Sequence, residues 1–283
     1  MHTLKVTVIQ SDLRWEDRDA NLSMFGEKIN AVQESMELVL LPEMFSTGFS
    51  MHPAALAEPM DGPSVAWMRS VATSKKIILA GSLIIEDKGN YYNRLIWMLP
   101  SGELGYYDKR HLFGYAGEDC VYTRGSKRLI ASVKGWKINL LICYDLRFPV
   151  WARQAVTVPF RLPENTPGAE SVSVSVLYPG PEYDVLVYVA NWPQARAHAW
   201  KTLLQARAIE NQCYVIGVNR VGKDGNGIGY SGESMIVDPL GEVIQTAGDH
   251  ETTFSWVLDP DLLHQARKKF PFLKDADPFF IGR

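Results

Sequence analysis

Short, uninterrupted apolar runs constrain the fold of this chain more than any other feature of its sequence. They lie at residues 37–42, 77–85, 138–143 and 184–190. A strand with one face in water alternates apolar and polar residues, whereas a short continuous apolar run is typical of a strand buried on both faces. The runs therefore predict a sheet covered on both sides, within a layered α/β fold.

Segments with helical periodicity supply the cover for such a sheet. Apolar residues at positions 22, 25, 29, 32 and 36 recur at steps of three and four, which predicts one face of a helix. Further helices are predicted over residues 63–72, 196–212 and 260–269. Other predicted strands are 5–10, 91–99 with 104–108, 129–133 with 137–143, 213–221, 234–238, 242–246 and 252–258. Because helices alternate with strands early and strands pair as hairpins later, we predict mixed sheets covered by helices.

Composition excludes several classes of protein. The 283 residues suffice for one large α/β domain or two ordinary ones. The net charge of −3 gives no basic surplus for nucleic acid or an anionic membrane, and the longest apolar stretch is too short to cross a bilayer. We therefore expect no nucleic-acid partner and no membrane association. The first residues lack a signal-peptide pattern, and the odd number of cysteines, 3, favours a reducing cytoplasm.

One segment, at about residues 153–183, differs from the rest of the chain. It contains five prolines and no lysine between its ends, and serine alternates with valine at 171–176. We interpret it as a surface insertion that carries an exposed β-ribbon.

Three reactive side chains each close one of the predicted strands. Glu43 follows the run at 37–42, Cys143 ends the run at 138–143, and Lys109 ends a hairpin strand. Each has an ordinary explanation: an exposed carboxylate, a small hydrophobic core residue and a surface lysine, respectively. If the strand ends converge, however, a base, a nucleophile and a cation share one pocket, which is the set that cysteine catalysis requires.

Three blocks of the sequence resemble the signature motifs of the carbon–nitrogen hydrolase (nitrilase) superfamily. The blocks are Leu-Pro-Glu at 41–43, Tyr-Asp-Lys-Arg-His-Leu-Phe at 107–113 and Ile-Cys-Tyr-Asp-Leu-Arg-Phe-Pro at 142–149. Further similarity lies at 206–211 and 230–234. The third block, together with Tyr-Val-Ala-Asn-Trp-Pro at 188–193, looks like the omega-amidase branch, particularly its bacterial members.

The resemblance covers nearly the whole chain. It implies a single carbon–nitrogen hydrolase domain over residues 1–283, built as a four-layer α-β-β-α sandwich with mixed sheets and dimerised through a helical face. The insertion at about 153–183 is longer than this family leads us to expect, which puts the geometry of the entrance to the site in doubt. Other omega-amidases tend to carry small hydroxyl residues where this chain has Asn-Trp-Pro at 191–193, so their substrate preference does not transfer as a whole.

The resemblance also implies catalytic roles, without a cofactor or a metal ion. Glu43 is expected to act as the general base that takes the proton of Cys143, which attacks the amide carbonyl. Lys109 is expected to stabilise the oxyanion together with a backbone N–H near Tyr144. Glu118 matches a second glutamate that the family keeps near the lysine, and we expect it to orient Lys109 or the base.

Arg147 is the residue that the resemblance assigns to the substrate's carboxylate. A guanidinium fork suits bidentate recognition of a carboxylate, although an arginine at this position could equally form a structural ion pair. Phe45, Phe49 and Trp192 either wall the pocket or are ordinary core aromatics. The expected substrates are short ω-amides of dicarboxylic or 2-oxo-dicarboxylic acids, such as 2-oxoglutaramate and 2-oxosuccinamate, which are hydrolysed to the acid and ammonia via a thioester.

Other readings of the sequence remain open. The chain could have another carbon–nitrogen hydrolase activity, as a carbamoyl-amide hydrolase or a nitrilase, or be a non-catalytic binding protein on the same fold. A protease-like dyad of Cys143 with His111 or His198 ranks low. The glycine-rich segment at 227–232 matches a dinucleotide motif but precedes a strand, so we interpret it as a hairpin turn. The six histidines show no metal-binding spacing.

Overall fold

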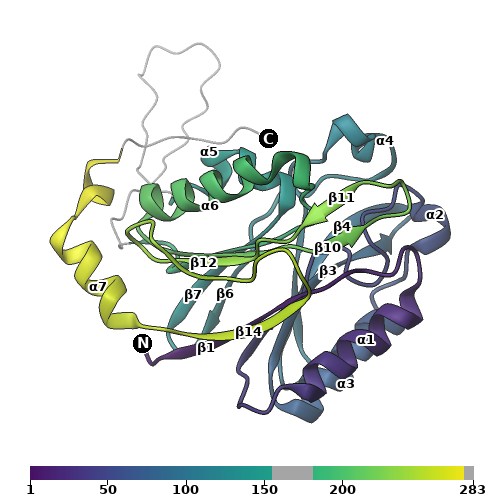
Figure 1. The fold of residues 1–283 in the computed structure, drawn as a ribbon, viewed down its shortest axis with the longest axis horizontal. Coiled ribbons are helices and arrows are strands. Elements are labelled where there is room, and N and C mark those ends of the chain that lie inside the picture. Colours follow the sequence, from purple (N-terminus) through teal and green to yellow (C-terminus); the bar gives the residue numbers. More distant parts are fainter. Residues whose placement is uncertain (155–180, 277–283) are drawn as a thin grey trace, which may run out of the picture.

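The computed structural model describes residues 1–154 and 181–276. Apart from its two ends, the predicted insertion, with the ribbon at 171–176, lies outside the described residues. Most of the described chain is organised around two large sheets with helices on their outer sides (Figure 1).

The first sheet consists of strands from the N-terminal part of the chain and one strand from the C-terminal part. They are β1 (Leu4–Gln10), β2 (Leu38–Leu40), β3 (Ile78–Asp87), β4 (Asn90–Met98), β5 (Leu104–Asp108) and β14 (Thr252–Leu258), in the order β14-β1-β2-β3-β4-β5. β1, β2 and β3 run parallel, and the other neighbours pair antiparallel. The sheet is therefore mixed, as the sequence predicts.

The second sheet has the same mixed character. Its strands are β6 (Ile130–Val133), β7 (Trp136–Ile142), β8 (Val185–Val189), β9 (Tyr214–Val218), β12 (Met235–Val237) and β13 (Val243–Thr246), in the order β13-β12-β9-β8-β7-β6. The central strands β7, β8 and β9 run parallel. These three strands are buried along almost their whole length, which is what their continuous apolar sequences require.

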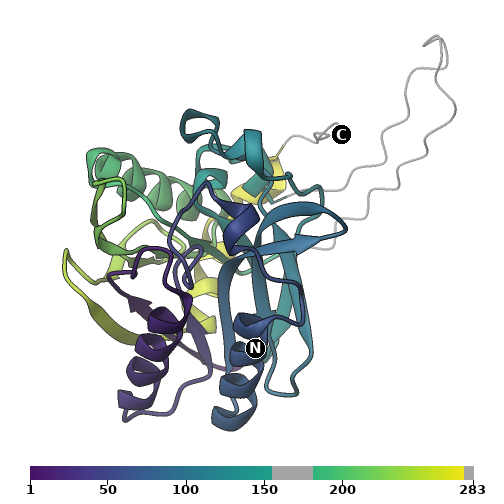
Figure 2. The same cartoon turned by 90° about the vertical axis from the view of Figure 1, so that its right-hand side faces the viewer.

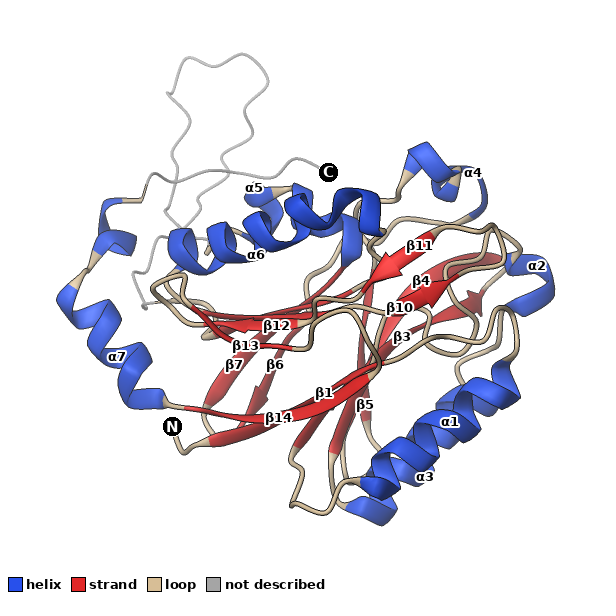
Figure 3. Cartoon of the chain, viewed as in Figure 1, coloured by secondary structure: helices blue, strands red, loops and turns tan. Residues whose placement is uncertain are grey.

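Helices cover the outer face of each sheet and complete four layers (Figures 2 and 3). α1 (Arg18–Ala31) and α3 (Pro63–Lys75) cover the first sheet, and one apolar cluster fills the space between them. α6 (Ala197–Asn211) covers the second sheet. A second, larger cluster lies between the two sheets and beneath α6. The predicted α-β-β-α sandwich is thus confirmed.

The remaining elements are mostly short and lie in the connections between strands or near the C-terminal end of the described chain. They are α2 (Pro53–Leu56), η1 (Gly114–Ala116), α4 (Glu118–Val121), η2 (Cys143–Arg147), α5 (Pro149–Ala152), η3 (Gln194–Arg196), β10 (Val221–Lys223), β11 (Gly229–Ser231), α7 (Pro260–Lys269) and η4 (Phe272–Asp275). The glycine-rich segment at 227–232 forms the turn and second strand of the β10–β11 hairpin, which confirms the hairpin interpretation. Within the described residues, no helix is long and apolar enough to cross a membrane.

Three elements differ from the sequence prediction. The strand predicted over 213–221 is divided, because the polar residues Asn219 and Arg220 separate β9 from β10 and bury their side chains in loop contacts. The helix predicted to reach residue 36 ends at Ala31, and Val32 is already extended. β3 continues to Asp87 and pairs with β4 through a two-residue turn in which both residues have positive φ, a long hairpin that the sequence analysis missed.

Candidate active site

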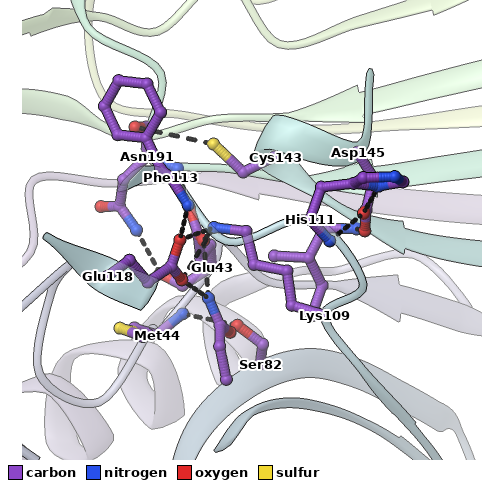
Figure 4. A network of polar contacts seen from close by, with 12 residues as sticks. Glu43, Met44, Ser82, Lys109, His111, Phe113, Glu118, Cys143, Asp145 and Asn191 are labelled. Atoms are coloured by element: carbon purple, nitrogen blue, oxygen red, sulfur yellow. Dashed lines mark hydrogen bonds and ion pairs between the residues drawn. The ribbon is translucent and has the colours of Figure 1, made fainter. Parts of the chain in front are cut away.

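The ends of strands from both sheets meet at one point between the sheets. Glu43 follows β2 and Lys109 directly follows β5, so the first sheet provides a carboxylate and an ammonium group. Cys143 directly follows β7 in the second sheet. The exposed fractions of the three residues are 0%, 0% and 9%, respectively. They are therefore not surface groups at strand ends, and Figure 4 shows the Lys109 side chain reaching toward both glutamates of the site.

Lys109 is held by two buried carboxylates. Its Nζ donates to Glu43 Oε1 at 2.9 Å and to the two oxygens of Glu118 at 2.9 and 2.8 Å. Glu118 is the first residue of α4, and its Oε2 also accepts from the backbone N–H of Phe113 at 2.5 Å. Glu118 thus fixes the ammonium group against Glu43.

Glu43 is held on its other sides by two asparagines. Asn93, from the middle of β4, donates its amide to Glu43 Oε1 at 2.7 Å. The backbone N–H of Asn191, just beyond β8, donates to Oε2 at 2.8 Å, and the Asn191 side chain donates to the Glu43 carbonyl at 2.6 Å. Both oxygens of this buried carboxylate therefore accept hydrogen bonds, and its orientation is fixed by both sheets.

Cys143 occupies a sharp turn between β7 and η2. Its φ is +44°, a left-handed conformation that a residue with a Cβ rarely adopts. The thiol donates to the Asn191 carbonyl, with 3.9 Å between sulfur and oxygen. Burial, the charge of Glu43 and a hydrogen bond with Glu43 raise the pKa of the Cys143 thiol well above its usual value, although Lys109 opposes this. The resting residue is therefore a thiol, and a thiolate must be generated by proton transfer.

The three charged groups beside the thiol carry one more negative than positive charge. Burial lowers the pKa of Lys109, but Glu118 and Glu43 outweigh this and raise it. Burial and repulsion by Glu43 raise the pKa of Glu118, against the opposing charge of Lys109. Because two carboxylates share one ammonium group, this cluster can accept a proton more readily than a balanced ion pair could.

Asp145 ties the turn that carries Cys143 to the loop that carries Lys109. Its Oδ2 accepts from the Ile142 N–H at 3.0 Å and from the Tyr107 hydroxyl at 2.8 Å. Its Oδ1 accepts from the His111 N–H at 3.0 Å and lies 2.8 Å from His111 Nδ1 (Figure 4). Asp145 is fully buried. Its hydrogen bonds therefore fix the turn that carries Cys143, in the second sheet, relative to the loop that carries Lys109, in the first sheet.

A cavity of about 670 Å³, including the space open to solvent, lies in front of Cys143. Its lining includes three of the four residues that the sequence predicted as substrate-binding, namely Phe49, Arg147 and Trp192, together with Tyr144. The Arg147 guanidinium lies 5.0 Å from the centre of the Trp192 ring, and the Lys109 ammonium lies 5.0 Å from that of Phe49. Arg147 is exposed and forms no ion pair with the described residues. The described residues therefore give no structural ion pair of Arg147, which was the alternative to substrate binding.

One sequence prediction about this region is corrected. Phe45 does not reach the cavity but packs against Phe25 and Trp67 in the core between the first sheet and its helices. Met44 has a φ of +43°, which breaks the strand alternation and turns Phe45 away from the Glu43 side. Among the described residues, no hydrogen bond joins Cys143 to His111 or His198, which agrees with the low rank of the protease-like dyad.

Sequence reasoning missed three residues of the site. Asn191 directly follows a buried strand, so the rule that identified Glu43 and Cys143 would also have found it. Asn93 lies in the middle of β4, where nothing in the sequence separates it from an ordinary strand residue. Arg196, at the end of η3, lines the cavity and also carried no signal. Among the described residues, no group of three His, Cys, Asp or Glu side chains could hold a metal ion.

The chain is similar along its whole length to known proteins. It matches the family model described as carbon-nitrogen hydrolase over residues 5–268. It is 40% identical over 280 residues to the Omega-amidase YafV of Escherichia coli strain K12, with 99% of each chain covered. It is 29% identical over 273 residues to the 2-oxoglutaramate amidase of Bacillus subtilis strain 168, covering 95% of this chain and 96% of that protein.

A solved structure is similar to the same extent. A CN-hydrolase superfamily protein from Xanthomonas campestris, crystallised with an arsenic adduct in its active site, is 40% identical and has a TM-score of 0.88 over 100% of both chains. Together these similarities confirm the resemblance that the sequence motifs predicted.

Proposed function

The chain belongs to the carbon–nitrogen hydrolase family and hydrolyses carbon–nitrogen bonds, and we propose that it is a cysteine-dependent ω-amidase. The amidase class is shared with its relatives. The nucleophile, the roles of the site residues and the substrate are our proposal. One observation carries it above the others: the Cys143 thiol lines a cavity that also presents an arginine, and the buried, hydrogen-bonded pair of Glu43 and Lys109 lies beside that thiol.

In the proposed reaction, Glu43 is the base and Cys143 the nucleophile. Glu43 takes the thiol proton as the sulfur attacks the amide carbonyl carbon, and Lys109 and a backbone N–H at Tyr144 stabilise the oxyanion. The carbon–nitrogen bond breaks, and Glu43 passes the proton to the departing ammonia. A thioester remains on Cys143.

The same base completes the cycle. Glu43 removes a proton from water, the resulting hydroxide attacks the thioester, and the acid leaves while the sulfur regains a proton. Support comes from the resting thiol, because a cysteine with a raised pKa needs a base at the moment of attack. The surplus negative charge of Glu43, Glu118 and Lys109 favours this proton transfer.

We propose short ω-amides of dicarboxylic and 2-oxo-dicarboxylic acids as substrates, with Arg147 binding the remaining carboxylate. Arg147 lines the cavity with its guanidinium held over the Trp192 ring, so it is presented to a ligand and not to an acidic side chain of the described protein. A relative of known activity, the 2-oxoglutaramate amidase of Bacillus subtilis, acts on an amide of this type.

Arg147→Gln tests the substrate assignment. Loss of a charge-assisted hydrogen bond should reduce kcat/KM for 2-oxoglutaramate roughly tenfold to a hundredfold. Ammonia release from a neutral amide of similar length, such as pentanamide, should change by less than about threefold because no charge is lost there. An equal loss for both amides would contradict the carboxylate-binding role. Preferential release from carbamoylated amines or nitriles by the unmodified protein would favour those activities.

We further propose a cytoplasmic homodimer. The helical layer over the second sheet exposes apolar side chains, with Ile209 on α6 at 56% and Val150 on α5 at 54% exposure, which would suit a second copy. Light scattering after size exclusion should give twice the mass of one chain at micromolar concentration. The mass of a single chain would contradict the dimer without affecting the chemistry above.

A further inference from the structure

Arg196 is a second guanidinium on the wall of the cavity, and the proposed reaction assigns it no role. It ends η3, immediately before α6, and its guanidinium carbon lies 5.2 Å from the centre of the Phe113 ring. Trp192, which lies under Arg147, donates its ring N–H to the Arg196 carbonyl at 2.8 Å. The two arginines are therefore held against aromatic rings on neighbouring parts of one cavity.

Among the described residues, Arg196 resembles Arg147 in forming no ion pair with an acidic side chain. The arginine ion pairs formed by the described residues involve positions 18, 94, 128, 207, 220 and 267 only. Asp224, the one acidic side chain among the described residues that line the cavity, is buried. Its Oδ2 accepts from Tyr230, and its Oδ1 accepts from two backbone N–H groups. This carboxylate is therefore engaged within its own hairpin.

Two regions of opposite charge therefore adjoin Cys143. The buried cluster of Glu43, Glu118 and Lys109 carries a surplus negative charge. In the cavity lining, Arg147 and Arg196 provide two positive charges against the single charge of Asp224. A substrate with a neutral amide at one end and a carboxylate at the other would lie in one orientation, with its amide at the thiol.

We propose that Arg196 is a specificity-determining residue that, together with Arg147, selects 2-oxo acid amides and rejects 2-amino acid amides. The inference rests on the proposed function, because it concerns the group beside the carboxylate that Arg147 is proposed to bind. A keto oxygen at carbon 2 accepts a hydrogen bond from a guanidinium, whereas an ammonium group there would face two like charges. Glutamine would thus be excluded although it differs from 2-oxoglutaramate at one carbon only.

Binding measurements on the complete chain with Cys143→Ala test this inference without turnover. Four ligands are titrated by calorimetry: 2-oxoglutaramate, the monoamide of glutaric acid, glutamine and pentanamide. The Arg196→Gln exchange is added to this parent, and Lys201→Gln is the matched control. Lys201 lies on α6, five positions after Arg196, and is paired with Glu233, so its loss removes one charge outside the cavity.

We expect Arg196→Gln to weaken binding of 2-oxoglutaramate roughly tenfold to a hundredfold and of the glutaric monoamide less. The preference for 2-oxoglutaramate over glutamine should fall at least about tenfold, and pentanamide should be unaffected. Arg196→Lys, which keeps the charge but not the fork, should still exclude glutamine. Lys201→Gln should leave all four affinities within about twofold.

Two outcomes would overturn the inference, and they can be told apart. If the parent binds 2-oxoglutaramate tightly and Arg196→Gln leaves its preference over glutamine unchanged, Arg196 has no part in specificity while the proposed function stands. If the parent binds pentanamide as well as 2-oxoglutaramate, the proposed substrate class is wrong, and the role of Arg196 is wrong with it. An unchanged melting temperature of the variants excludes misfolding as the cause of a loss.

Discussion

At the scale of single residues, the Cys143 thiol is defined by the groups around it. Burial and Glu43 together hold its pKa above the usual range, while Lys109 acts in the opposite direction. Glu43 therefore suppresses the thiolate in the resting protein, although the proposed mechanism needs Glu43 to create that thiolate during attack. These two roles can be separated by experiment.

Glu43→Gln should accelerate alkylation of Cys143 while strongly reducing turnover. Without the negative charge of Glu43, the pKa of the Cys143 thiol should fall, because the Lys109 ammonium group then stabilises the thiolate. Each unit by which the pKa falls gives about tenfold more thiolate at neutral pH. The pH profile of iodoacetamide labelling should therefore move to lower pH, and kcat should fall by about 10²-fold or more because the base is lost.

The labelling experiment needs a Cys120→Ser background. Cys120 is exposed and would react with the reagent whatever its role, whereas Cys213 is fully buried and burial raises its pKa. Cys143 is then the accessible thiol to follow. A labelling profile that stays in place, or moves to higher pH, in Glu43→Gln would show that Glu43 is not the group that controls this thiol.

Asn93 provides a second test at this scale. Asn93→Ala removes the amide that donates to Glu43 at 2.7 Å and leaves a buried carboxylate oxygen with one fewer donor. We expect kcat to fall about tenfold to a hundredfold with little change in KM, and the free energy of unfolding to fall by about 1–3 kcal/mol. Asn90→Ala, at the exposed start of the same strand, should change stability by less than about 0.5 kcal/mol. Equal kinetics for both variants would remove Asn93 from the site.

At the scale of elements, the turn between β7 and η2 carries Cys143, the proposed nucleophile. Three polar contacts of Asp145, with the Tyr107 hydroxyl and with the backbone and ring of His111, hold this turn against β5 and the loop that follows it. The positive φ of Cys143 is compatible with glycine but costs free energy for a residue with a Cβ. The turn therefore stores strain at the position where the thiol must point into the cavity.

Comparing Cys143→Gly with Cys143→Ala measures this strain. Both variants lack the nucleophile and should be inactive. The glycine variant should nevertheless be more stable than the alanine variant by about 0.5–1 kcal/mol, because it adopts positive φ without penalty. At Ala131, in β6 with an ordinary φ, replacing alanine by glycine should instead lower the stability of the protein. Chemical denaturation gives both differences, and an alanine variant that is the more stable at position 143 would refute the strain.

Elements also show what the sequence could and could not predict. Buried strands were recognisable because a two-faced sheet needs continuous apolar runs, and the ends of those runs located Glu43 and Cys143. Phe45 was misplaced because the left-handed backbone at Met44 follows from the contact of the loop with β3, which no local pattern reveals. Asn93 was invisible because a polar residue within a strand is distinguished only by the carboxylates that it meets across the fold.

At the scale of the whole molecule, the site exists only where the two sheets face each other. Glu43, Asn93 and Lys109 come from the first sheet, and Cys143 and Asn191 come from the second. Periodicity predicted both sets of strands, but their relative placement depends on side-chain packing between the sheets. The three signature blocks supplied that placement by resemblance, which is why the meeting of Glu43, Lys109 and Cys143 could be predicted and the position of Arg196, outside the blocks, could not.

The central claim is that this assembly forms a thioester on Cys143, and rapid-quench mass spectrometry tests it most directly. After mixing with 2-oxoglutaramate, we expect ammonia release together with an acyl adduct on the peptide that contains Cys143, removable by hydroxylamine. Cys143→Ala should release no ammonia and carry no adduct. Sustained ammonia release by Cys143→Ala, or an adduct on another residue during turnover, would contradict the account.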